Sequence, residues 1–516
     1  MKRPHWGRRY GAVALAGCTM AATALVGPAG AQAGARARAA SGTLGPTVEL
    51  TAAQNSITVP RFGGFVMLDP GVYVASLGSA LQFDVGRASY TKPIRITQVI
   101  HTPSGIQTRA LPAAVLDGFN GLRNFVHLTV KDSHGKVVAS QQVEFCPNSF
   151  APARATPNGP ATSPYPQQCA PFDPFPLGNV WGVARGWAVD PFQTFGNGLQ
   201  LALGTYHVTV TVTSLYRRLL HISAAHATAN VTVRVVPGVG CCGPALRRGQ
   251  VKGRPLASLP RNVPSLAHPP TAALPDLVPL PSWGISTSRT PGRNSRDLLN
   301  FSATVWVGGN GPLDVQGFRS HGSPVMQAYQ YFWRNGRIIG RARAGTMGFD
   351  TANGHNHWHF QQFAQYSLLN SAKTLAVASH KVGFCIAPTD NVNLLLRHAA
   401  WQVSFIGFSG MCGQSTALWV QEYMPVGWGD SYQQSVAGQA FDITSMPKGT
   451  YYIQVTANPS KILYETTTSN DVSLRQVILG GTRGHRTVRV PAWHGIDPEG
   501  GATTGPGPTP SPIPSP

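Results

Sequence analysis

Three histidines, His355, His357 and His359, alternate within five residues of the C-terminal half. Imidazole is a common ligand of copper and zinc, and a three-nitrogen set with open positions suits a metal that must also meet water, oxygen or substrate. Alternate residues of a strand share a face but lie roughly 6.6 Å apart, so all three reach one ion only if the backbone bends. The preceding Asn353-Gly354 pair is a turn signal that could supply the bend. We therefore expect a metal site here rather than three ordinary strand histidines.

The spacing of the histidines does not by itself select the chemistry. A cupin site adds a glutamate a few residues after its H-x-H, and residues 360–366 contain no acid. Multicopper oxidases need several H-x-H pairs and a Cys-His element, whereas this sequence has one such cluster. A mononuclear metal hydrolase stays open, although we identify no catalytic carboxylate near the cluster.

The N-terminus has the pattern of an export signal, which predicts a signal peptide over residues 1–33. Basic residues precede an apolar run from Gly11 to Val26, and Ala31-Gln32-Ala33 is a small-x-small cleavage site. The run is shorter than a membrane span, so we expect a secreted protein with no transmembrane span. Two alternatives stay open, a twin-arginine signal at Arg8-Arg9 and a lipid anchor at the cell surface through Cys18.

The composition predicts a mainly β protein with few helices. The 516 residues include 57 glycines and 43 prolines, and only 12% are charged. The formal net charge of +21 predicts attraction to anionic cell-envelope polymers. No recognised binding module accompanies the charge, so a nucleic-acid partner is not expected.

The order of patterns along the chain predicts five segments. After the signal peptide, residues 48–236 contain short runs that alternate apolar and polar residues, as in an immunoglobulin-like β region of unknown role. Residues 237–272 are a linker rich in Pro, Gly and Arg, residues 273–480 a second β domain, and residues 481–516 a disordered basic, Pro-rich tail. The scattered histidines of the first β region, His101, His127 and His207, are expected to be strand-face residues rather than ligands.

Six cysteines remain after the predicted cleavage, which favours disulfides in an exported chain. Cys146 with Cys169 and Cys385 with Cys412 are the sensible local pairs. The adjacent Cys241 and Cys242 could bond each other only through a strained ring, so inter-domain, intermolecular or metal roles stay open for them.

Further motifs follow the histidine cluster in a fixed order. They are Ser379-His380-Lys381-Val382-Gly383-Phe384-Cys385, Gly427-Trp428-Gly429-Asp430-Ser431-Tyr432, Gln439-Ala440-Phe441-Asp442-Ile443-Thr444 and Gly449-Thr450-Tyr451-Tyr452. The ordered set, from Leu274 to about Leu479, resembles the lysyl oxidase family. In that family a copper-binding H-x-H-x-H precedes a lysine in H-K-x-x-F-C and a tyrosine in D-x-Y, shortly before Q-x-x-D-I-T.

The resemblance implies a lysyl-oxidase-like β domain in which His355, His357 and His359 bind copper. It also implies that Lys381 and Tyr432 combine into the cofactor lysine tyrosylquinone. Such an enzyme uses molecular oxygen to oxidise primary amines, including lysine side chains of proteins, to aldehydes, with release of ammonia and hydrogen peroxide.

Three points qualify what the resemblance implies. Asp430 and Asp442 are candidates for the catalytic base because they are near Tyr432 in sequence, although each also fits a structural or turn-forming role. Trp428 stands where the animal enzymes carry a cysteine. The alternative function is a non-catalytic metal-binding or cell-envelope adhesion protein that retains the domain.

Overall fold

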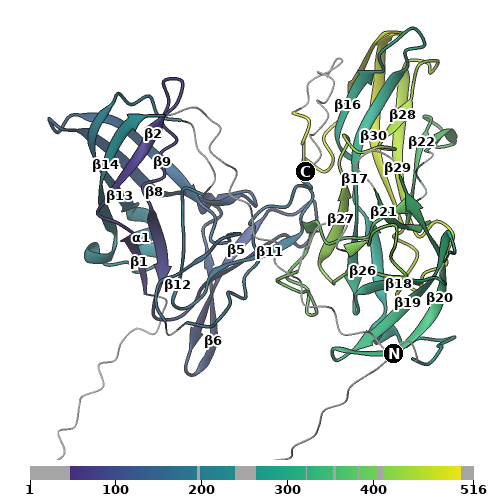
Figure 1. Ribbon diagram of the computed structural model, residues 1–516, viewed down its shortest axis with the longest axis horizontal. Coiled ribbons are helices and arrows are strands. Elements are labelled where there is room, and N and C mark those ends of the chain that lie inside the picture. The colour runs from purple at the N-terminus through teal and green to yellow at the C-terminus, as the bar shows by residue number, and fades with distance from the viewer. Residues whose placement is uncertain are drawn as a thin grey trace, which may run out of the picture. The chain divides into compact units, whose positions relative to one another are not determined.

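The protein is described by a computed structural model that covers residues 47–157, 159–193, 198–238, 263–320, 322–351, 356–379, 381, 383–403 and 411–500. All of these residues belong to one compact unit. They are mainly in β-strands, and helix α1 (Ser214–Leu219) is only six residues long. The predicted mainly β fold with few helices is confirmed (Figure 1).

Three sheets form the first half of the described chain. The first has the order β1 (Val48–Ala52), β3 (Val72–Ser76), β12 (Trp187–Val189), β10 (Ala153–Arg154). The second has the order β11 (Gly178–Val183), β4 (Leu81–Gly86), β5 (Arg95–Thr102), β6 (Gly105–Leu111). The third has the order β2 (Ser56–Arg61), β14 (Thr228–Pro237), β13 (Gly204–Val212), β8 (Gly121–Asp132), β7 (Leu116–Asp117), with β9 (Val137–Phe145) also paired to β8.

The alternating sequence patterns of this half correspond to half-buried strands. In β13, Tyr206, Val208 and Val210 are buried, whereas His207, which lies between two of these apolar residues, is exposed. The apolar run at residues 65–68 forms only single bridges, from Phe65 to Phe62 and from Val66 to Leu199. Gly63 and Gly64 both have positive φ angles, so the chain turns there instead of continuing β2.

Three further sheets form the second half. One has the order β15 (Pro275–Pro279), β17 (Asp297–Gly309), β27 (Trp428–Tyr432), β25 (Asp390–Asn391), with β16 (Trp283–Arg289) and β28 (Ala440–Asp442) also paired to β17. Another has the order β24 (Gly383–Phe384), β21 (His357–Gln361), β20 (Arg337–Asp350), β19 (Val325–Arg334), β18 (Leu313–Phe318), β26 (Trp419–Met424). The last has the order β23 (Leu375–Ala378), β22 (Ala364–Leu369), β29 (Gly449–Ala457), β30 (Val472–Thr482), β31 (His485–Arg489).

A row of aromatic side chains connects these three sheets through the core. Phe301 of β17 packs edge to face on Tyr366 of β22, with 5.2 Å between ring centroids. Tyr366 in turn contacts Phe384 of β24, and Phe384 contacts Tyr432 of β27, at 5.8 and 5.1 Å. Such edge-to-face pairs add to the free energy gained by burying the rings. The core therefore fixes β24 and β27 relative to each other.

Both predicted local disulfides are present. Cys146 is bonded to Cys169, and Cys385 is bonded to Cys412. Cys18, Cys241 and Cys242 lie outside the described residues.

The prediction that a disordered tail begins at residue 481 is wrong, because ordered structure continues past this residue. Residues 485–489 form β31, and Trp493 packs on Tyr90 at 4.8 Å between ring centroids. The basic residues misled the prediction, because Val488 and Val490 alternate with them and are buried. Residues 501–516 lie outside the described chain, as do residues 1–46 and 239–262, so the predicted signal peptide and linker stay predictions. Of the helices in the described residues, none is long and apolar enough to span a membrane.

We expect the segment after β31 to contribute to stability through Glu499. Its carboxylate pairs with Arg475 at 2.9 Å, and the two side chains are only 4% and 1% exposed. Removing one partner leaves a buried charge uncompensated, which costs about 3–5 kcal/mol. Glu499→Ala should lower the free energy of unfolding on this scale in chemical denaturation. The exposed Asp497→Ala is the control, and equal midpoints for both variants would contradict the assignment.

Candidate active site

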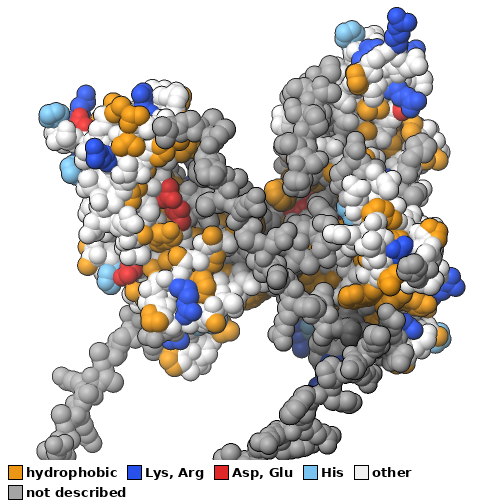
Figure 2. All heavy atoms as spheres, viewed as in Figure 1, with side chains coloured by type: hydrophobic (Ala, Val, Ile, Leu, Met, Phe, Trp, Pro, Cys, Tyr) orange, Lys and Arg blue, Asp and Glu red, His pale blue; other side chains and the backbone are white. Residues whose placement is uncertain are grey.

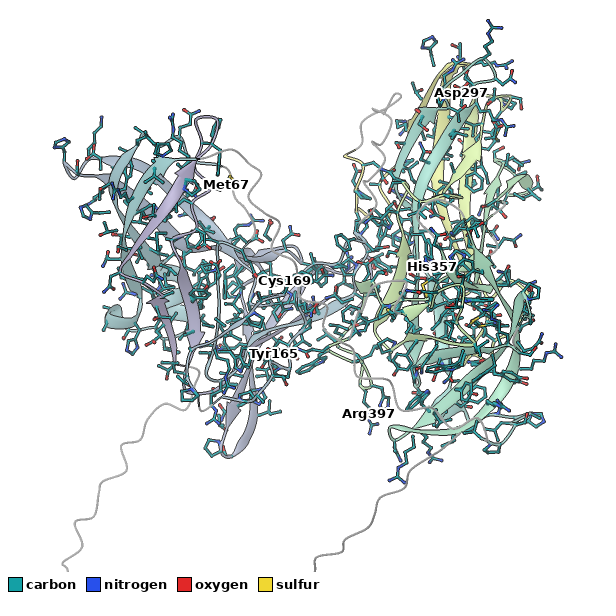
Figure 3. The ribbon with its side chains drawn as sticks, in the orientation of Figure 1. Met67, Tyr165, Cys169, Asp297, His357 and Arg397 are labelled. Atoms are coloured by element: carbon teal, nitrogen blue, oxygen red, sulfur yellow. A yellow bond between two sulfur atoms is a disulfide. The ribbon has the colours of Figure 1, made fainter. Side chains whose placement is uncertain are left out.

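Two of the three clustered histidines lie side by side on β21. His357 and His359 are 5% and 2% exposed, and their ring centroids are 4.8 Å apart. His357 is labelled within the second half of the chain in Figure 3. Alternate strand residues share a face, so this pairing follows from the sequence pattern. His355 lies outside the described residues, and so does the Asn353-Gly354 turn expected to bend the chain.

A carboxylate that the sequence analysis missed lies against this pair. Asp350, the last residue of β20, places Oδ2 3.3 Å from Nδ1 of His359. The antiparallel register of β20 and β21 sets Asp350 directly opposite His357, which is why a residue five positions before the cluster comes near it. A carboxylate on Nδ1 fixes the tautomer of a histidine and makes the other ring nitrogen, Nε2, a better metal ligand.

This donor chemistry fits a metal that binds imidazole, such as copper. The two rings are buried, share one face and have a supporting carboxylate. Among the described residues no group of three metal-binding side chains is found, and the third predicted ligand, His355, is not one of them. The structure thus brings together two of the three predicted ligands.

Lys381 and Tyr432, which are far apart in the sequence, meet in the core. Lys381 lies two residues before the edge strand β24, and Tyr432 is the last residue of β27. The Lys381 Nζ lies 4.4 Å from the centroid of the Tyr432 ring and 5.1 Å from that of Phe384. Both side chains are nearly buried, with 8% and 9% of their surface exposed. The amine therefore sits over the face of the tyrosine ring, shielded from water.

The backbone of Cys385 holds the Tyr432 ring in place. The Tyr432 hydroxyl accepts the Cys385 N–H at 2.7 Å and donates to the Cys385 carbonyl at 3.1 Å. Cys385 is itself fixed by its disulfide to Cys412. Burial, followed by the nearby carboxyl groups of Asp430 and Glu422, raises the pKa of the Tyr432 phenol well above its usual value.

Burial has the opposite effect on the neighbouring amine. It lowers the pKa of Lys381 to about 8, although the charges of Asp430 and Asp350 act to raise it. Asp430 is 2% exposed and, being two residues from Tyr432 on β27, shares its face. Burial raises the pKa of Asp430 well above 3.8, against the charge of Lys381 and the Ala387 N–H. Burial therefore disfavours the charged form of both Lys381 and Asp430.

Asp430 and Asp442, the two candidates for the catalytic base, lie in different environments. Asp430 interacts with Lys381 and carries an oxygen, Oδ2, for which no hydrogen-bond partner is found among the described residues. Asp442 is exposed, accepts the Thr444 N–H at 3.0 Å and lies 3.7 Å from Arg296. Asp442 therefore has the environment of a turn-forming carboxylate, while Asp430 belongs to the site.

Glu422 is a second residue that sequence reasoning missed. It is fully buried on β26 and accepts the Ile386 N–H at 3.0 Å. Burial raises its pKa well above 4.5, which favours the neutral acid. Glu422 lies in an ordinary alternating strand pattern, and only the pairing of distant strands brings it near Tyr432.

Other sequence expectations can be placed as well. Trp428, at the position of a cysteine in the animal enzymes, donates its Nε1–H to the Ala400 carbonyl at 2.6 Å and is buried. His101 and His127 lie on strands β5 and β8, with their Nε2 atoms 3.0 Å from Gln82 Oε1 and 2.8 Å from Ser140 Oγ. These two histidines have the local hydrogen bonds of strand-face residues.

The fold and the site define the second half of the chain as a β domain with a buried lysine–tyrosine pair beside buried histidines. A family model for lysyl oxidase matches residues 324–487. Lysyl oxidase homolog 2 of Gallus gallus is 29% identical over 139 residues, and the human homolog 2 is 27% identical over 139. Lysyl oxidase homolog 4 of Mus musculus is 27% identical over 138 residues.

The C-terminal part of this chain is therefore a lysyl oxidase family domain, as its motifs indicate. Each of these matches covers 27% of this chain and 16% of the relative. The similarity is thus confined to this domain, and the activities of the whole relatives are not transferred by it.

We expect Tyr432→Phe to destabilise protein that is produced without copper. The variant removes a hydroxyl that satisfies both the N–H and the carbonyl of Cys385. Leaving buried backbone groups unsatisfied costs about 1–3 kcal/mol. Thermal or denaturant unfolding at pH 7 measures the loss. Lys448→Ala, which removes an exposed lysine of the same domain, is the control and should not destabilise; equal losses in both variants would contradict the role of the hydroxyl.

Proposed function

We propose that the C-terminal domain is a copper-dependent amine oxidase whose cofactor, lysine tyrosylquinone, forms from Lys381 and Tyr432. The observation that carries the proposal is the 4.4 Å between the Lys381 Nζ and the Tyr432 ring centroid within the buried core. A cross-link requires Nζ to bond to a ring carbon, and the amine is already over that ring. Membership of the lysyl oxidase family supports the same assignment.

His355, His357 and His359 would hold the copper in this proposal, and Asp350 would orient His359. When bound, copper and the quinone would supply the redox chemistry by which a primary amine and oxygen give an aldehyde, ammonia and hydrogen peroxide. The remaining roles belong to side chains of the protein.

Lys381 would act as the nucleophile, and for this its amine must be neutral. With a pKa of about 8, about a tenth of the Lys381 side chains are neutral at pH 7. An ordinary lysine, with its pKa near 10.4, is neutral in fewer than about one molecule in a thousand at that pH. The cause is burial against Phe384 and Tyr432, which disfavours the charged form.

Asp430 is the carboxylate we assign to proton transfer. It is buried, interacts with Lys381 and shares a strand face with Tyr432. A carboxylate whose pKa is raised is a stronger base than an ordinary carboxylate, which suits a group that must take up a proton. Asp442, exposed and paired with Arg296, has no such place in the proposal.

The substrate would be a primary amine or a lysine-bearing protein outside the cell, with molecular oxygen as the second substrate. The predicted signal peptide and Cys18 lie outside the described residues, so secretion or lipid anchoring stays part of the proposal. The net charge of +21 would add attraction to anionic envelope polymers. On the face that Figure 2 shows, the described Lys and Arg side chains are scattered rather than gathered in one patch.

The first test is peptide mass spectrometry on protein produced with copper and oxygen. We expect a covalently linked pair of peptides that contain Lys381 and Tyr432. Lys381→Ala and Tyr432→Phe should each abolish the cross-link and amine-dependent release of hydrogen peroxide while copper stays bound.

Matched controls come from the same domain. Tyr451→Phe removes another buried tyrosine hydroxyl, which donates to the Pro447 carbonyl at 3.0 Å, and Lys448→Ala removes an exposed lysine. Both should retain the cross-link and the activity. Unmodified Lys381 and Tyr432 peptides in copper-loaded protein would instead favour the alternative, a metal-binding or adhesion protein without turnover.

The pH dependence of cross-link formation is a second test. Because the Lys381 pKa is lowered to about 8, the neutral amine is scarce at pH 6.5 and predominates above pH 9. Copper-free protein is mixed with copper and oxygen at each pH, and the linked peptide is quantified over time. The initial rate should rise about tenfold for each pH unit below 8 and level off above 9. A rate that still rises steeply beyond pH 10 would indicate an unshifted lysine.

A further inference from the structure

A segment of the first half of the chain is hydrogen-bonded to the lysyl oxidase domain. We call residues 165–178 the docking segment. The Leu177 N–H donates to the Val392 carbonyl at 2.8 Å, and the Leu394 N–H donates to the Gly178 carbonyl at 2.9 Å. Gly178 also begins β11, and it forms a parallel bridge with Asn393. The sheet that contains β11 is thus joined by main-chain hydrogen bonds to the chain that follows β25.

Side chains extend this contact along the docking segment. Asp390 of β25 accepts the Phe172 N–H at 2.6 Å. Gln402 donates to the Tyr165 carbonyl at 2.9 Å, and the Tyr165 ring stacks on Trp401 with 5.9 Å between centroids. The contact therefore includes main-chain, polar and aromatic interactions on residues 390–402.

The docked strand β25 is the neighbour of the strand that carries Tyr432. Asp390 pairs with Gly429 in the β25–β27 register. Thr389 adds three hydrogen bonds to β27. Its N–H and its hydroxyl both donate to the Gly429 carbonyl, and its hydroxyl oxygen accepts the Ser431 N–H at 2.8 Å. On its other edge β27 pairs with β17, where Ala303 faces Tyr432. One side of the Tyr432 strand is thus held by β17 and the other by residues attached to the docking segment.

The contact also brings carboxyl groups of the two halves together. Asp173 of the docking segment and Asp390 are 1% and 0% exposed. Burial and then the charge of Asp390 raise the pKa of Asp173 to about 7. Asp390 in turn interacts electrostatically with Asp430, which interacts with Lys381. A row of buried ionisable groups therefore leads from the docking segment to the site.

We propose that the docking segment is a positioning element of the lysyl oxidase domain, which makes the first half of the chain an integral part of the site rather than a separable module. By fixing β25, it fixes the edge of β27 and so the Tyr432 ring under the Lys381 amine. The consequence for cofactor formation rests on the proposed function, whereas the docking itself does not.

Gly178→Val in the full chain tests the docking directly. A Cβ at Gly178 would lie 2.7 Å from Asn393 Oδ1 and 2.8 Å from Leu395 Cγ, so a valine would force both of these side chains of the contact to move. Gly480→Val is the matched control, because a Cβ there would lie 2.7 Å from Thr487 Oγ1 within the sheet of β30 and β31. Hydrogen–deuterium exchange with mass spectrometry reports on peptides 388–396 and 427–433.

We expect Gly178→Val to speed exchange in both peptides at least tenfold, and Gly480→Val to leave them unchanged. Unchanged exchange in Gly178→Val, or the same change in both variants, would overturn the docking. The yield of the Lys381–Tyr432 cross-link should fall several-fold in Gly178→Val only. A full yield despite faster exchange would overturn the positioning role. Faster exchange with no cross-link in any chain, the natural one included, would leave the docking standing and reject the proposed function.

A second pair of variants tests the contact by stabilising it, without introducing a steric clash. Asp173 and Asp190 each begin an Asp-Pro-Phe turn in which the carboxylate accepts the N–H two residues on, at 2.7 Å in both. Only Asp173 faces Asp390. At pH 8, Asp173→Asn removes the repulsion and should slow exchange in peptide 388–396, while Asp190→Asn should not.

Asp173 interacts with groups from several elements, and these also influence its charge. They are Asp390 of β25, Thr304 of β17, Trp283 of β16, and Arg87 and Tyr90. At pH 5, Asp173 is protonated in the folded chain, so Asp173→Asn should then change exchange little. An equal effect of Asp173→Asn and Asp190→Asn at pH 8 would count against the inference.

Discussion

The arrangement of the site depends on one pair of hydrogen bonds, those between the Tyr432 hydroxyl and the backbone of Cys385. They join the end of β27 to the chain that leaves β24, two strands that belong to different sheets. Because Lys381 lies only two residues before β24, the same bonds that fix the ring also restrict how far the amine lies from it. The Cys385–Cys412 disulfide and the Phe384 ring restrain this junction further. Ring and amine are thus positioned by main-chain geometry rather than by mutual attraction.

Burial shifts these groups away from the charged states that they would have in water. In water an amine is charged and a carboxylate ionised, but both lose solvation in the core. Lys381 is pushed toward the neutral amine, while Asp430 and Glu422 are pushed toward the neutral acid. Each shift costs stability, since the free energy of desolvation is supplied by the rest of the fold. The three surrounding sheets and their aromatic contacts supply a core large enough to offset that cost.

The sequence was informative where chemistry depends on local order. Alternation predicted strands such as β13 and β14, the spacing of cysteines predicted both bridges, and motif order indicated the family. It failed where position depends on the register of distant strands. Asp350 and Glu422 carry no local signal, and only the β20–β21 and β26 pairings place them near the site. The ordered chain after residue 480 was missed because its arginines obscured a short alternating strand.

The same limit applies to the first half of the chain, whose role no motif suggests. Strand β27 is short, and a short strand with one open edge would leave N–H and C=O groups unpaired. Here β25 covers that edge with only two residues, too few to be stable alone. The hydrogen bonds from Leu177 and to Gly178 extend the cover to residues that a larger sheet holds in place. In the proposed function the cofactor forms from Lys381 and Tyr432 of the chain itself, so the polypeptide must hold the ring and the amine in place before the cofactor exists. A second β region attached next to the tyrosine strand meets that requirement.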